Sequence, residues 1–269
     1  MKKLILQSFI GVLLFFSIWF ALAQIDWVSV FRIEKMSNQT EEKLGNIFWE
    51  IIKKTEKENK NPDVIATVDT IVNRICLDNK IDRKSIKVHI IEKKEINAFA
   101  LPNGHLVIYT ALLSNSDSPE ELSGVICHEI AHIELNHVIK KLIKEVGISV
   151  LISTTTGNRN TEVIQETLKT LSSTAFDRSL EKEADIKAVD YLANAKINPN
   201  GLANFLYKLA EPKNETTKYL TWISTHPESK ERADYIMEYS KKKNANYKDV
   251  LNIKTWNKTK EDLKLTSQN

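Results

Sequence analysis

The stretch His128-Glu129-Ile130-Ala131-His132 decides how this 269-residue chain is interpreted. Two histidines four residues apart lie on one face of an α-helix, so both imidazoles can reach one metal ion, with the intervening carboxylate beside a remaining coordination position. With six His among 269 residues, this pattern is expected by chance only about 0.01 times per chain. The stretch therefore predicts a zinc site, in which Zn²⁺ lowers the pKa of water towards ~7 and Glu129 takes the proton.

The residues around the motif predict that it lies on a helix. Ser118-Pro119-Glu120-Glu121 is a capping box with proline at the first helical position. Apolar residues follow at helical spacing, namely Leu122, Val125, Ile126, Ile130 and Ile133. The helical pattern runs over residues 118–141.

Composition indicates one helix-rich domain. The chain is 42% hydrophobic, which is enough for a full core, and its seven Gly and six Pro leave little material for linkers. A net charge of +3, from 38 basic and 35 acidic residues, is typical of an ordinary solvated surface and not of a nucleic-acid-binding protein.

The two cysteines, Cys76 and Cys127, do not form a disulfide framework. Cys127 directly precedes His128 and points about 100° away from it around the helix, so a buried thiol is expected there in preference to a zinc ligand. The redox state of the two thiols stays open.

The N-terminal sequence predicts targeting to a membrane. Residues 4–23 form an almost uninterrupted apolar run of about 20 residues, long enough to span a bilayer. Ala21-Leu22-Ala23 before Gln24 also has the form of a signal-peptidase site, so a cleaved signal peptide and a retained anchor are both open. We expect residues 1–23 to be this segment, 24–243 a catalytic domain on the extracytoplasmic side, and 244–269 a polar, lysine-rich, loosely ordered tail with at most a short helix.

Hydrophobic periodicity predicts the remaining elements. A small antiparallel sheet is expected before the metal helix, with one strand at residues 86–91 and two more within 97–109, folded back at Asn103-Gly104. The chain breaks at residues 157–160, and helices are expected at residues 40–60, 63–79, 161–173, 200–210 and 227–243.

A third ligand is sought in residues 178–185, because catalytic zinc usually takes three protein ligands. Glu181 and Asp185 are one helical turn apart, so if Glu181 binds the ion, Asp185 can hydrogen-bond a ligating imidazole. Standing alone, such an acidic cluster is more often a solvated helix face. His226-Pro227, followed by Arg232, is by itself a weak signal that also fits a plain helix start.

Four ordered blocks together resemble a known family: residues 97–104, the metal helix, residues 178–185, and His226-Pro227 with Arg232. The chain is similar to the HtpX and CaaX-prenyl-protease family of zinc metallopeptidases (peptidase family forty-eight), especially its exported BepA-type bacterial members without their tetratricopeptide region. The resemblance implies an α+β, mostly helical, gluzincin-like domain with a small antiparallel sheet beside the metal helix.

The resemblance also implies roles for individual residues. It assigns one zinc ion to His128, His132 and Glu181, and the general base to Glu129, while Glu183 occupies a variable position. His226 is expected to stabilise the oxyanion or, in a latent form, to take the place of the water. Further expectations concern neighbours: Arg232 and Arg178 hold the His226 loop and the metal helix, His137 is structural, and His89 and His105 have no assigned role.

A sheet edge holds the substrate as an added strand in thermolysin-like proteases. The candidates for such contacts here are Ala98, Phe99, Ala100, Leu106 and Val107. The alternative is a core hairpin that binds no ligand.

The expected function is that of a zinc endopeptidase of the cell envelope, periplasmic or otherwise extracytoplasmic, which hydrolyses peptide bonds. By resemblance, its substrates are proteins or peptides, including unfolded or misassembled envelope proteins. It would contact the membrane through the N-terminal segment if this is uncleaved, and its oligomeric state is open. The alternative is a largely latent, metal-bound envelope chaperone or assembly factor.

Overall fold

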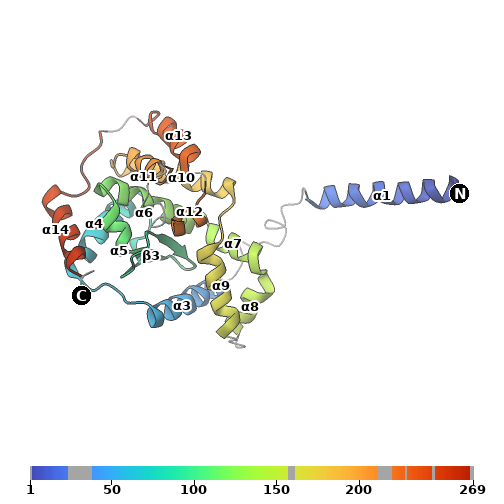
Figure 1. The fold of residues 1–269 in the computed structure, drawn as a ribbon, viewed down its shortest axis with the longest axis horizontal. Coiled ribbons are helices and arrows are strands. Elements are labelled where there is room, and N and C mark those ends of the chain that lie inside the picture. Colours follow the sequence, from blue (N-terminus) through green and yellow to red (C-terminus); the bar gives the residue numbers. More distant parts are fainter. Residues whose placement is uncertain are drawn as a thin grey trace. The chain divides into compact units, whose positions relative to one another are not determined.

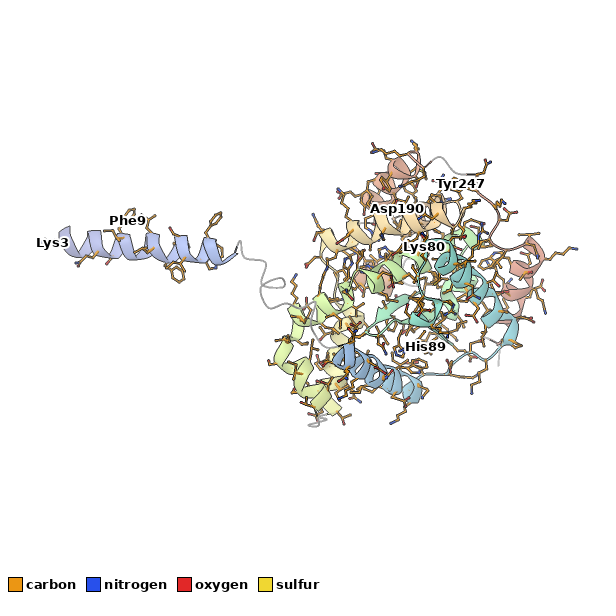
Figure 2. The ribbon with its side chains drawn as sticks, turned by 180° about the vertical axis from the view of Figure 1, so that it is seen from behind. Lys3, Phe9, Lys80, His89, Asp190 and Tyr247 are labelled. Carbon is orange, nitrogen blue, oxygen red and sulfur yellow. The ribbon has the colours of Figure 1, made fainter. Side chains whose placement is uncertain are left out.

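The computed structural model of the chain describes residues 2–23, 38–156, 161–210, 220–227, 229–243 and 246–266. It divides into two units, Met1–Asn38 and Gln39–Asn269. The first contains helix α1 (Lys2–Ala23), from which side chains such as Lys3 and Phe9 project (Figure 2). Within these described ranges, no helix combines the length and the apolarity needed to cross a membrane. The break expected at residues 157–160, and residue 24 after the possible cleavage point, lie outside the described residues.

The second unit contains a three-stranded sheet with the strand order β1-β3-β2 (Figure 1). β3 (His105–Tyr109) pairs parallel with β1 (Lys87–Ile91) and antiparallel with β2 (Ala98–Leu101). The predicted strands are confirmed, but the expected antiparallel arrangement holds for β2 and β3 only. The segment after β1 carries the chain to the far edge of the sheet, and the hairpin then returns it to the centre.

The hairpin turn and helix α3 (Asn38–Thr55) fix each other. Asn103 and Gly104 have φ angles of 61° and 70°, the left-handed region that Asn and Gly tolerate best. A β-carbon on Gly45 of α3 would lie 2.2 Å from the carbonyl oxygen of Pro102, so only glycine permits this approach. Glu41 of α3 accepts a hydrogen bond of 3.1 Å from the Asn103 amide.

Helix α6 (Pro119–Glu134) lies at the centre of the helical part. In the view of Figure 1, α6 is above the sheet and α3 below it. α10 (Arg178–Asn194) and α11 (Asn200–Ala210) pack on α6, and α13 (Ser229–Ser240) covers both. The other described helices are α4 (Pro62–Asn79), the short η2 (Arg83–Ser85), α5 (Thr110–Asn115), α7 (His137–Val146), α8 (Ile148–Thr156), α9 (Thr161–Ser173), α12 (Leu220–Thr225) and α14 (Ile253–Thr266).

Two glycines bring α6 and α11 close together. A β-carbon on Gly124 would lie 2.7 Å from Cα of Leu202, and one on Gly201 would lie 2.4 Å from the backbone of Glu120. Because the two backbones nearly touch, α6 is held in one position over the sheet.

The structure corrects two expectations. The helical pattern over residues 118–141 belongs to two helices, because Asn136 has a left-handed φ of 56° and ends the run between α6 and α7. The C-terminal segment is not a loosely ordered tail. It contains α14, whose Trp256 and Leu263 are 2% and 5% exposed, and Thr259 hydrogen-bonds Thr67 of α4 over 2.7 Å. Two apolar residues one heptad apart bury this helix despite its many lysines.

We predict that Gly124→Val destabilises the protein by about 1–3 kcal/mol, because the added carbons must push α6 and α11 apart. Urea unfolding followed by circular dichroism measures the change. Gly11→Ala is the control, since a β-carbon at that position meets nothing within 4 Å. A wild-type unfolding midpoint for Gly124→Val would contradict the close packing.

Candidate metal centre

Local sequence places the motif on one face of α6. The Ser118 side chain accepts a hydrogen bond of 3.3 Å from the Glu121 amide, and the Glu121 carboxylate accepts one of 2.9 Å from the Asp117 amide. With Pro119 at the first helical position, these bonds fix where the helix begins. His128 and His132 then lie one turn apart and are both fully buried.

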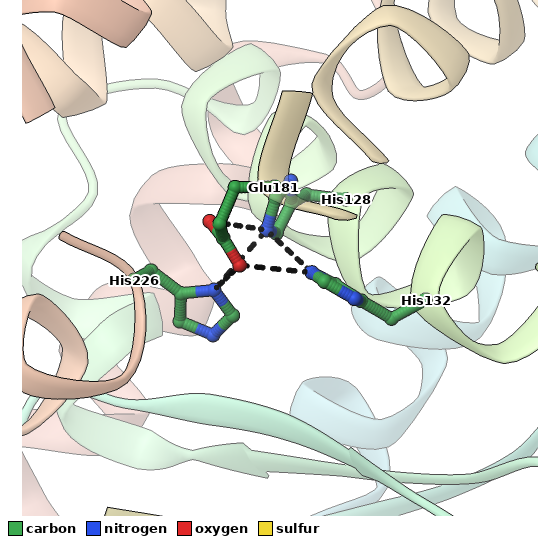
Figure 3. A group of neighbouring side chains, drawn as sticks. All are labelled: His128, His132, Glu181 and His226. Carbon is green, nitrogen blue, oxygen red and sulfur yellow. Dashed lines mark hydrogen bonds and ion pairs between the residues drawn. The ribbon is translucent and has the colours of Figure 1, made fainter. Parts of the chain in front are cut away.

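The structure brings four predicted residues into one cluster: His128 and His132 of α6, Glu181 of α10, and His226 after α12 (Figure 3). One potential ligand atom from each lies within 4.8 Å of all the others. All four side chains are buried, with exposed fractions between 0% and 2%. The cluster therefore sits in the interior, where the charge of a carboxylate needs a partner.

The distances within this cluster fit one metal ion. The Nε2 atoms of His128 and His132 are 3.0 Å apart, and His128 Nε2 lies 3.6 Å from Oε2 of Glu181. Oε1 of Glu181 lies 3.3 Å from Nε2 of His132 and 2.9 Å from Nδ1 of His226. Tetrahedral zinc with bonds of about 2.0–2.1 Å holds neighbouring ligand atoms about 3.3 Å apart.

The protonation states also suit metal binding. Burial lowers the pKa of His132 and of His226 to about 4 each, and it lowers the pKa of His128 too, so the imidazoles are neutral and can ligate. Burial opposes ionisation of Glu181, but His226 and Arg232 hold the pKa of Glu181 well below its usual value. Neutral nitrogens and one carboxylate form the donor set of a catalytic zinc site.

Glu129 lies beside this cluster and is fully buried. Its Oε2 accepts a hydrogen bond of 3.1 Å from the Ala100 amide of β2, whereas its Oε1 has no hydrogen-bond partner among the described residues. Oε1 is 3.4 Å from Nε2 of His226. Burial and the nearby Glu181 raise the pKa of the Glu129 carboxyl well above its usual value. One oxygen is thus fixed to the sheet, and the other is left to accept a proton.

Asp185 and Arg232 contact the ligand residues His128 and Glu181 and each other. Oδ1 of Asp185 lies 2.9 Å from Nδ1 of His128, the imidazole nitrogen that faces away from the cluster. Arg232 donates two hydrogen bonds of 2.8 Å to Asp185, and its Nη1 lies 2.5 Å from Oε2 of Glu181. The Tyr235 hydroxyl also donates to Asp185. The sequence indicated Asp185 and Arg232 but not Tyr235, which lies one turn after Arg232 on α13.

Aromatic residues that the sequence did not indicate cover the cluster. The Phe176 ring lies 4.1 Å from the imidazole of His132, and Trp222 stacks on His226 at 4.6 Å and 26°. The Phe176 amide donates a hydrogen bond of 3.1 Å to the Thr225 carbonyl, joining the segment before α10 to the segment before His226. The only available signal was proximity in sequence, since each aromatic lies within five residues of a predicted site residue.

A buried lysine holds Phe176 in place. Nζ of Lys141 donates hydrogen bonds of 2.9 and 2.5 Å to the carbonyls of Leu171 and Thr174, and it lies 4.2 Å from the centre of the Phe176 ring. Burial lowers the pKa of Lys141 to about 8.

The candidate substrate strand splits into two parts. Ala98, Phe99 and Ala100 lie on β2, which is an edge strand next to α6. Leu106 and Val107 lie on the central strand β3, whose backbone pairs with neighbours on both sides. An extended peptide can therefore add only along β2 on this side of the sheet.

Other predicted residues lie outside the cluster. His89 (labelled in Figure 2) hydrogen-bonds His105 over 2.8 Å and stacks on Trp49 of α3 at 3.5 Å. Cys76 and Cys127 are free, buried thiols, and burial raises the pKa of both.

Comparisons with known proteins give the chain a family. Residues 59–240, which include every residue of the cluster, match the model of peptidase family M48. The chain is 30% identical over 184 residues to Metalloprotease LoiP of Escherichia coli (strain K12), covering 66% of this chain and 71% of that protein.

Two other relatives are longer than the matching region. The chain is 26% identical over 179 residues to the beta-barrel assembly-enhancing protease of Yersinia pestis, covering 62% of this chain and 37% of that protein. It is 31% identical over 166 residues to the mitochondrial metalloendopeptidase OMA1 of Bos taurus, covering 55% of this chain and 31% of that protein. Because the family model covers more than half of the sequence and the whole ligand cluster, this chain belongs to peptidase family M48.

Proposed function

We propose that this protein is a zinc-dependent endopeptidase that hydrolyses peptide bonds. The observation that carries this proposal is the convergence of three neutral imidazoles and Glu181 beside Glu129, in a chain of peptidase family M48. His128, His132 and Glu181 hold the ion. Zinc bound by these residues lowers the pKa of water and polarises a peptide carbonyl.

Glu129 is the general base in this proposal. Its Oε1, which has no hydrogen-bond partner among the described residues, takes the proton of the attacking water and returns it to the leaving amine. The Ala100 amide holds Oε2 and so keeps the carboxylate in one orientation while the proton moves.

We propose that the outer edge of β2, whose residues are buried in this structure, binds the substrate backbone. The Ala100 amide points away from β3, as its bond to Glu129 shows, and Ala98 points the same way because alternate residues of a strand share a direction. Ala98 thus offers its amide and carbonyl to an extended peptide that passes Glu129. Main-chain pairing favours an unfolded polypeptide over a folded one.

The closed geometry supports a latent resting form. His226 stands within the ligand cluster at 2.9 Å from Glu181 and 3.3 Å from His128, where a fourth ligand belongs. Displacement of His226 opens that position to water, and its imidazole can then donate to the oxyanion. A protein held in the closed form would act as a metal-bound chaperone or assembly factor, which is the second candidate function.

We place the protein in the cell envelope, on the extracytoplasmic side. One relative is named for enhancing β-barrel assembly, and another is a bacterial metalloprotease. The apolar residues 4–23, after Lys2 and Lys3, support export through a signal peptide. Quality control of envelope proteins is the corresponding role.

Glu129→Gln is expected to lower cleavage of an unfolded substrate such as casein by about 10²–10⁴-fold, because the amide cannot take a proton. Its zinc content, measured by atomic absorption, should match the wild type. Glu134→Gln, an exposed position on the same helix, serves as the control. If Glu129→Gln still complements a deletion strain fully, binding and not proteolysis is the function.

Glu181→Ala is expected to reduce zinc from about one ion per chain to a minor fraction after dialysis, because only two ligands from the proposed set remain. The same loss should not occur in Glu166→Ala, an exposed carboxylate on α9. Full zinc retention by Glu181→Ala would assign the third ligand elsewhere.

His226→Ala is expected to raise basal cleavage, by about tenfold if the wild-type site is closed about nine-tenths of the time. Initial rates on a quenched fluorescent peptide measure the effect, with the exposed Glu231→Ala on α13 as the control. A fall in rate would instead make His226 an oxyanion donor without a gating role, and an unchanged rate would remove it from the site.

A further inference from the structure

A chain of hydrogen bonds leads from the second histidine of the motif to the protein surface. Nδ1 of His132, the ring nitrogen that faces away from the cluster, lies 3.1 Å from Nδ1 of His137. Nε2 of His137 lies 3.2 Å from Oε2 of Glu183. His137 is fully buried, whereas the Glu183 side chain is 53% exposed.

The backbone positions explain why Glu183 reaches His132 only through a third residue, His137. Glu183 lies two residues from both Glu181 and Asp185 on α10, about 200° around the helix, so its carboxylate cannot face the cluster as theirs do. On the other side, the left-handed Asn136 ends the run of α6 and lets His137 fold back against His132. His137 therefore bridges Nδ1 of His132 and the Glu183 carboxylate.

Only one arrangement of hydrogens satisfies all three groups. Nε2 of His132 must present a lone pair to the cluster, so its neutral ring carries hydrogen on Nδ1. Nδ1 of His137 then accepts, which places the hydrogen of neutral His137 on Nε2. This Nε2–H donates to the Glu183 carboxylate, an acceptor.

We propose that His137 and Glu183 are positioning residues that fix the tautomer and the ring orientation of His132. This inference rests on the proposed metal-binding function of His132. The two metal-facing imidazoles of α6 are then each held by a carboxylate of α10, His128 by Asp185 directly and His132 by Glu183 through His137. Outer hydrogen bonds of this kind strengthen metal binding by about 10–100-fold.

Because Glu183 is exposed, substitutions at this residue can distinguish a positioning role of His137 from a role in core packing alone. A histidine that only fills the core does not depend on an exposed carboxylate, so substitutions of Glu183 test the hydrogen-bond chain without disturbing the interior. Glu183→Ala removes the acceptor, whereas Glu183→Gln keeps an amide oxygen that can accept the Nε2–H of His137. Glu166→Ala on α9 is the matched control for loss of an exposed carboxylate.

Zinc affinity, measured by competition with a chromogenic chelator, is the first readout. Glu183→Ala should weaken zinc binding about tenfold, at the lower end of the range for such outer contacts, and Glu183→Gln should recover most of the loss. The thermal stability of the metal-free protein should be the same for all variants. Wild-type zinc affinity in Glu183→Ala would overturn the proposal.

The ring tautomers are the second readout. In zinc-loaded protein, two-bond ¹H–¹⁵N spectra of the imidazoles should show hydrogen on Nδ1 of His132 and on Nε2 of His137. Hydrogen on Nδ1 of His137 would overturn the proposal. The two levels of inference fail differently: if Glu181→Ala keeps its zinc, the metal site is misassigned, whereas if only Glu183→Ala is silent, the site stands and the chain through His137 does not.

Discussion

The structure depends on the burial of two carboxylates, Glu181 and Asp185, between α6 and α13. Neither charge can be buried without partners, because an unpaired carboxylate in the interior costs several kcal/mol. Arg232 compensates both charges, and the Asp185 carboxylate also accepts from Nδ1 of His128, the ring nitrogen that faces away from the cluster. This requirement fixes α6, α10 and α13 against one another. The close approach of Gly124 to α11 sets the distance between α6 and α11.

The same arrangement couples the sheet to the chemistry. Glu129 points from α6 to the edge strand β2 and accepts a hydrogen bond from the Ala100 amide, so the proposed base and the proposed substrate strand are held in one geometry. The segment carrying His226, whose Nε2 lies 3.4 Å from Oε1 of Glu129, is tied to Phe176 by a backbone hydrogen bond and by aromatic contacts. Glu129 is thus held to β2, and His226 is held by its contacts with Phe176 and Trp222.

The sequence was sufficient where local spacing determines geometry. The four-residue spacing placed His128 and His132 together, and the one-turn spacing of Glu181 and Asp185 placed both carboxylates on one face of a helix. Their position at the cluster was implied by the family resemblance. It was insufficient where contacts join distant segments. Alternation of side chains identified β1 and β3 but not their parallel pairing, and the lysines of α14 obscured the helical spacing of Trp256 and Leu263. Phe176 and Lys141 act through contacts with other segments, which no local pattern indicates. His137 was expected to be structural, and local spacing could not reveal its partner, Glu183, which lies 46 residues away.

The central claim is that one zinc ion binds to His128, His132 and Glu181. Anomalous diffraction from crystals of the zinc-loaded protein, collected on both sides of the zinc absorption edge, tests it most directly. One strong anomalous peak is expected within bonding distance of Nε2 of His128, Nε2 of His132 and the Glu181 carboxylate. A peak held by other residues, such as His89 and His105, or no peak at these three side chains, would contradict it.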